Sequence, residues 1–63
     1  MPQVFEEFTE ITLSRSVDVQ GMHMPAGARG VIMAAWADGR AYEVEFETPR
    51  HVVLTIEDAD LRK

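Results

Sequence analysis

Residues 41–47 constrain the fold of this chain more than any other part of the sequence. They read Ala-Tyr-Glu-Val-Glu-Phe-Glu, so apolar and acidic side chains alternate strictly. Side chains of a β-strand point to opposite faces in turn, whereas a helix would spread both classes around its circumference. The pattern therefore predicts a half-buried strand. Its core side carries Tyr42, Val44 and Phe46, and its solvent side carries Glu43, Glu45 and Glu47.

A hairpin is expected around this strand. Asp38-Gly39 lies just before it, and both residue types suit tight turns because they tolerate positive φ. Residues 30–36 are rich in β-branched and aromatic side chains and are predicted to be the antiparallel partner strand. The two strands should form the centre of the sheet.

The rest of the chain is divided into short pieces by glycine and proline. Residues 9–13 are predicted to be the first strand, 14–28 a long binding loop, and 50–55 a fourth strand. Thr55 with Asp58 three residues later fits an N-cap, which predicts one helical turn reaching Asp60 before a brief fifth strand at Leu61–Arg62. The N-terminal arm, residues 1–8, fits either one helical turn or an extended segment.

Small size limits the architecture. The chain has 63 residues, no cysteine and 46% hydrophobic residues, so one domain over residues 9–63 must be held by its apolar core. Short strands that curl over one another need no helix layer. The order of elements predicts an all-β, five-stranded SH3-like barrel with a long first loop and a short 3-10 turn before the last strand. An OB-type barrel is the main rival.

Charge and hydropathy bear on location and partners. The N-terminus lacks a signal-peptide pattern and no stretch approaches the ~20 apolar residues of a membrane span, so we expect a cytoplasmic protein. Six basic and 11 acidic residues give a net charge of −5, which disfavours nucleic acids and anionic membranes and favours a basic protein partner. The same charge also serves solubility alone.

Several segments together resemble a known family. They are Ile-Thr-Leu at 11–13, Met-Pro-Ala-Gly-Ala-Arg-Gly-Val-Ile at 24–32, Trp-Ala-Asp-Gly-Arg-Ala-Tyr-Glu-Val-Glu-Phe at 36–46, Leu-Thr-Ile at 54–56 and Asp-Leu-Arg at 60–62. This pattern, over about residues 9–62, resembles the bacterial family known as domain of unknown function 4926. Val31 stands where the family usually has threonine, and the turn after Phe46 is shorter than in many members.

This resemblance carries implications of its own. It implies an SH3-like barrel without a recognised activity. Genes of the family often lie beside genes for small partner proteins, some of them toxin-like, which implies an antitoxin or immunity role. A second, weaker resemblance lies in Gly27-x-x-Gly30-x-Ile32, which is similar to the turn and strand of RNA-binding barrels. RNA binding would rely on the few nearby arginines, which are Arg15, Arg29 and Arg40.

Catalytic and metal chemistry find little support in the sequence. With no cysteine, a nucleophile would have to be Ser14 or Ser16, and no nucleophile-elbow pattern frames either residue. A metal site would need His23 and His51 to converge with carboxylates, and their spacing does not indicate this. We therefore expect no enzyme activity, no cofactor and no metal.

Candidate partner-binding residues are drawn from the loop, the hairpin and the acidic strand. They are Met22, His23, Trp36, Glu43, Glu45 and Glu47. Met24 is expected in the core, while Met22 is left open. Trp36 is favoured as core over an exposed anchor, and the glutamates form either a solvated face or a docking face for a basic partner.

Three functions follow as hypotheses. The first is a non-enzymatic protein-binding module, an antitoxin- or immunity-type partner of a small bacterial protein. The second is an RNA- or DNA-associated accessory barrel. The third is a self-assembling structural module, in which an edge strand pairs between copies.

Overall fold

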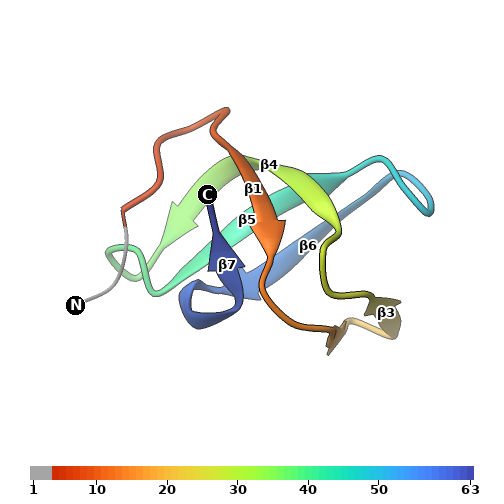
Figure 1. Cartoon of the computed structure of the whole chain (residues 1–63). Helices are drawn as coiled ribbons and strands as arrows, with labels where there is room; N and C mark the ends of the chain where they lie inside the picture. The colour runs from red at the N-terminus through yellow and green to blue at the C-terminus, as the bar shows by residue number, and fades with distance from the viewer. Residues whose placement is uncertain (1–3) are drawn as a thin grey trace.

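A computed structural model of the chain describes residues 4–63, and their regular structure is almost entirely β-strand (Figure 1). The elements in chain order are β1 Glu10–Leu13, β2 Val17–Val19, β3 Met22–Met24, β4 Arg29–Trp36, β5 Ala41–Phe46, β6 Val52–Glu57, the 3-10 turn η1 Asp58–Asp60 and β7 Leu61–Arg62. The all-β prediction is confirmed. So are the 3-10 turn and the short strand that follows it.

The main sheet is built on the predicted central hairpin. Its five strands lie in the order β6-β5-β4-β1-β7, and neighbouring strands are antiparallel. Val44 of β5 lies between Ile32 of β4 and Leu54 of β6, and all three side chains are buried. Residues 37–40 form the predicted turn, in which Ala37, Asp38 and Gly39 all have positive φ.

The sequence predicts a loop over residues 14–28, but this segment contains a second sheet. β2 and β3 pair as an antiparallel hairpin whose turn residues, Gln20 and Gly21, have φ of 51° and 78°. Positive φ at both central residues matches the twist of a two-residue hairpin turn. This hairpin forms its own sheet, and β7, with two residues, pairs with β1. No closed barrel is found among residues 4–63, so the five-stranded barrel is replaced by sheets of five and two strands.

The core lies between the sheets and extends into the N-terminal arm. Its buried hydrophobic residues are Phe5, Ile11, Leu13, Val17, Met24, Ile32, Tyr42, Val44, Phe46, Leu54, Ile56 and Leu61. The Phe5 ring packs edge-on against Tyr42, with ring centroids 5.3 Å apart, and the Phe5 N–H donates to the Tyr42 hydroxyl at 3.0 Å. Met24 is among these buried residues, which confirms its predicted place in the core.

The arm is not a helical turn where it is described. Residues 1–3 of the arm lie outside the described residues, and residues 4–8 contain only a turn, closed by the Thr9 N–H donating to Glu6 O at 3.1 Å. Phe5 enters the core, while Val4 and Phe8 are 82% and 68% exposed. Of these three apolar side chains, Phe5 alone is buried.

The strand predicted over residues 50–55 also differs in its bounds from the structure. β6 begins at Val52, after a turn with a cis peptide bond between Thr48 and Pro49, and continues through Thr55 to Glu57. Thr55 is therefore not an N-cap. Glu57 holds that position without a side-chain cap bond, and the Thr55 hydroxyl donates instead to Glu43.

Candidate functional site

The candidate site is the outer face of the β4–β5–β6 part of the main sheet, opposite the core. Trp36, at the end of β4, has 55% of its surface exposed. The prediction that favoured it as a core residue is wrong because the pairing of β4 with β5 shifts between Ile32 and Ala34. Residues directly opposite each other on paired strands share a face. The bulge therefore puts Ala34 opposite the outward Glu43, and Trp36 follows it to the outer face.

A carboxylate fixes the indole of Trp36. Trp36 Nε1 donates to Glu43 Oε2 at 2.7 Å, and Thr55 Oγ1 donates to the same oxygen at 2.8 Å. Glu43 lies opposite Ala34 on one side and Thr55 on the other, so the bonds run across β4, β5 and β6. We call Trp36, Glu43 and Thr55 the indole cluster. It holds a large amphipathic side chain in place while leaving much of its surface in water.

The turn of the β2–β3 hairpin reaches the edge of the same sheet. Gln20 Oε1 accepts the backbone N–H of Thr55 at 2.9 Å. Because β6 is the last strand on its side of the sheet, this amide replaces the carbonyl that a further strand would offer. The hairpin is thus tied to the strand that carries part of the indole cluster.

A second group of polar side chains lies at the other end of β5. His51 Nε2 is 2.7 Å from Glu45 Oε2 and 3.9 Å from Glu47 Oε2. The hydrogen bond with Glu45, followed by the charge of Glu47, raises the pKa of His51 above its usual value. We call Glu45, Glu47 and His51 the imidazole cluster. The spacing of the histidines in the sequence does not indicate this cluster, because Glu45 and Glu47 reach His51 from the other side of the β5–β6 turn.

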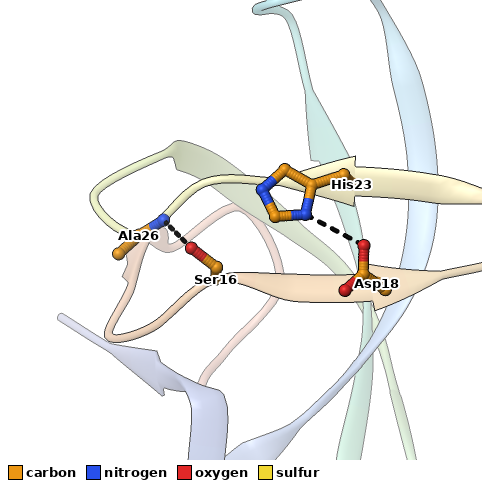
Figure 2. Close-up of polar contacts among 4 residues, drawn as sticks. All are labelled: Ser16, Asp18, His23 and Ala26. Carbon is orange, nitrogen blue, oxygen red and sulfur yellow. Dashed lines mark hydrogen bonds and ion pairs between the residues drawn. The ribbon is translucent and has the colours of Figure 1, made fainter.

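The two loop residues proposed from the sequence do not join this face. Figure 2 shows His23 of β3 beside Asp18 of β2, and Ser16 beside Ala26. His23 Nδ1 and Asp18 Oδ1 are 2.9 Å apart, and Ser16 Oγ accepts the Ala26 N–H at 3.2 Å. These contacts link the two arms of the hairpin. Met22 is half-buried against the core and offers little free surface. The six predicted residues are therefore divided: Trp36, Glu43 and Glu45 lie on the main sheet, Glu47 follows β5, and Met22 and His23 lie on the small sheet.

An open hollow of about 380 Å³ separates the hairpin from β6. Arg15 and Asp60 lie in its lining and form an ion pair. One of the three arginines considered for RNA contact is thus already engaged by a carboxylate. The lining also includes the carboxylates of Glu57 and of Asp18, the latter in contact with His23, so acidic side chains outnumber basic ones there.

Within the described part of the chain, no helix has the length and hydropathy to cross a membrane. Comparison of the chain with protein-family models, with curated proteins and with solved structures found no match.

Proposed function

We propose that this chain is a non-enzymatic protein-binding module of SH3-like architecture that docks a basic partner on the outer face of β4, β5 and β6. The observation that carries the proposal is the exposed, hydrogen-bonded indole of Trp36. Its side chain would insert into the partner, while the neighbouring glutamates attract and orient it.

The chemistry of Trp36 supports an anchoring role. Tryptophan is enriched among the few residues that dominate binding energy at protein interfaces. Its bond to Glu43 restricts the ring before any partner arrives, which lowers the ordering cost of association. Val53, 43% exposed, lies opposite Glu45 and adds apolar surface to the same face, farther along β5 than Trp36.

Charge supports a basic partner. Glu43 and Glu45 lie on this face, and Glu57 lies opposite Ala41 at the edge beside Trp36. The chain as a whole carries a net charge of −5. Such a surface speeds encounter with a positively charged protein and repels phosphate backbones. Binding should therefore weaken as salt is added.

The order of elements supports the SH3-like part of the proposal. A first strand, an inserted hairpin, three antiparallel strands, a 3-10 turn and a two-residue last strand follow one another here. The resemblance of residues 9–62 to domain of unknown function 4926 supports a more specific role as an antitoxin- or immunity-type partner of a small bacterial protein. The cytoplasm is the compartment in which we expect it to act.

The test compares two exposed aromatic residues. Tagged wild-type chain, Trp36→Ala and Phe8→Ala would each be used to recover partners from the source cells after nuclease treatment, and binding would be repeated with the purified partner. We expect a stoichiometric basic protein with wild type and Phe8→Ala and its loss with Trp36→Ala, because Phe8 is exposed but lies on the arm. Equal recovery by all three chains would refute the proposed face.

The same material separates the other two hypotheses. Recovery of RNA or DNA before nuclease treatment, with a steep loss as salt rises, would instead favour an accessory nucleic-acid barrel. Sedimentation that changes with protein concentration in the absence of other molecules would favour self-assembly. Either result without a protein partner would contradict the proposal.

A further inference from the structure

We propose that the imidazole cluster, Glu45, Glu47 and His51, binds a divalent transition metal ion of the Zn²⁺ type. This goes beyond the proposed function, because it concerns three side chains at the end of the β5–β6 hairpin and a ligand of another kind. One nitrogen and two carboxylates would supply three ligand atoms, and water would complete the coordination.

The positions of the ligand atoms support this inference. One potential ligand atom from each residue lies within 4.8 Å of the others. In a tetrahedral site with bonds of about 2.1 Å, neighbouring ligand atoms lie roughly 3.4 Å apart. The distances from His51 Nε2, 2.7 Å to Glu45 Oε2 and 3.9 Å to Glu47 Oε2, fall on either side of that value. Shifts of less than about 1 Å would bring these two contacts to the spacing of a metal site.

The convergence does not come from a simple run of acids. Glu45 lies in β5, Glu47 follows it, and His51 returns from the far side of the turn just before β6. The imidazole nitrogen is aimed at both carboxylates rather than at water alone, although 62% of its side chain is exposed. The hairpin thus assembles a mixed nitrogen and oxygen set from two chain segments.

The ligand types indicate the class of metal. Imidazole favours Zn²⁺, Cu²⁺ and Ni²⁺, whereas sites made only of oxygen ligands favour Mg²⁺ and Ca²⁺. Two carboxylates balance the charge of a divalent ion. Zn²⁺ accepts histidine and glutamate together in tetrahedral sites, so it is the ion we use to define the class.

The surroundings leave room for water ligands. A hollow of about 230 Å³ lies against Glu45 and Glu47, and its lining also includes Glu10, Arg29 and Thr48. Arg29 opposes a cation there, and Glu10 offsets its charge. A site with three protein ligands and an open side is the arrangement in which Zn²⁺ keeps a water molecule.

The chain offers a matched control in its other histidine. His23 also contacts one carboxylate, Asp18, at 2.9 Å and is 62% exposed (Figure 2). Among residues 4–63, no second carboxylate oxygen lies within 4.8 Å of both atoms of that pair, in contrast to residues 45, 47 and 51. If two carboxylates are needed in addition to imidazole, Zn²⁺ should distinguish the two histidines.

The experiment is a calorimetric titration of untagged, EDTA-treated protein with ZnCl₂, together with NMR of both imidazole rings. We expect one ion per chain, perturbation of the His51 ring before that of His23, and little competition from excess Mg²⁺. Glu47→Gln should weaken binding by about tenfold or more and His51→Ala should abolish it, while His23→Ala should bind as wild type. Absence of binding, or equal binding by His51→Ala, would overturn the proposal, as would equal perturbation of both rings.

Discussion

Replacing Gly30 with alanine tests how the main sheet is packed. A Cβ atom at this position of β4 would lie 2.6 Å from Val44 Cγ1, 2.9 Å from the backbone oxygen of Glu45 and 3.0 Å from Phe46 Cδ1. These contacts come from the adjacent strand, where Gly30 lies opposite Phe46. The added methyl group would therefore push β4 and β5 apart or displace two core side chains.

The expected cost follows from these distances. Forcing an extra methylene into a packed core costs about 1–3 kcal/mol. Because one of the close contacts is backbone oxygen, rotation of a side chain cannot relieve all of them, and we expect the upper half of that range. A core of this size supplies only ~3–5 kcal/mol in total, so Gly30→Ala should remove about half of the stability. The midpoint of thermal unfolding should fall by about 10–20 °C.

The assay is urea unfolding followed by far-ultraviolet circular dichroism, with a double-mutant cycle. Val44→Ala removes the atom that the new Cβ meets first, so Gly30→Ala should cost less in that background than in the wild type, by about 0.5 kcal/mol or more. Gly27→Ala is the comparison, because its Cβ meets nothing within 4 Å and only its φ of 87° opposes the change. The reasoning would be refuted if Gly30→Ala changed the free energy of unfolding by less than about 0.5 kcal/mol.

This prediction also bears on the resemblance to RNA-binding barrels. The glycines of that pattern are each explained without a nucleic acid. Gly30 is required by the close approach of β5, and Gly27 adopts a φ of 87° in the segment before β4. A glycine that the backbone geometry requires gives no evidence about what the protein binds.

Three further outcomes can be measured on the same protein. Tyr42→Phe removes the acceptor of the buried Phe5 N–H and should lower the free energy of unfolding by about 1–2 kcal/mol in urea titrations. Ala37→Gly should raise it by about 0.5 kcal/mol, because alanine at φ 50° is strained and glycine is not. In metal-free buffer, NMR should give His51 a pKa above 6.5, and Glu45→Gln should lower it. Because the folded pKa is raised, this pair should stabilise the fold fully below the unfolded pKa and lose its effect as pH rises through the folded value.

The sequence predicts burial most accurately where apolar and polar residues alternate with the two-residue period of a β-strand. Tyr42, Val44 and Phe46 are each 0% exposed, as the alternation in β5 predicts. The same reasoning failed for Trp36, because continuing the alternation of β4 from Ile32 would place it inside. A bulge reverses which residues of β4 face the core beyond Ile32, and nothing in the sequence of β4 marks its position.

Other features depend on contacts that local patterns do not encode. Gln20-Gly21 lacks the Asn-Gly or Asp-Gly signature of a tight hairpin, and each flanking strand has only three residues, so the local sequence predicts a loop where the second sheet forms. The imidazole cluster requires His51 to return beside Glu45 after the turn. That return is fixed by the pairing of β5 with β6, a tertiary feature.

The two clusters are close enough to influence each other, and the size of the effect can be estimated. Glu43 and Glu45 are next neighbours on one face of β5, about 6.6 Å apart along the strand. Two unit charges at that distance interact by roughly 0.6 kcal/mol in a water-like dielectric, and salt reduces this further. If both proposals hold, Zn²⁺ would neutralise Glu45 and remove about this much attraction for a partner cation held at Glu43. Docking of the partner should then weaken by about two- to threefold, and the partner should weaken Zn²⁺ binding by the same factor. Calorimetry of each ligand with and without the other measures this, and a tenfold change would mean that the ion contacts the partner directly rather than acting through charge.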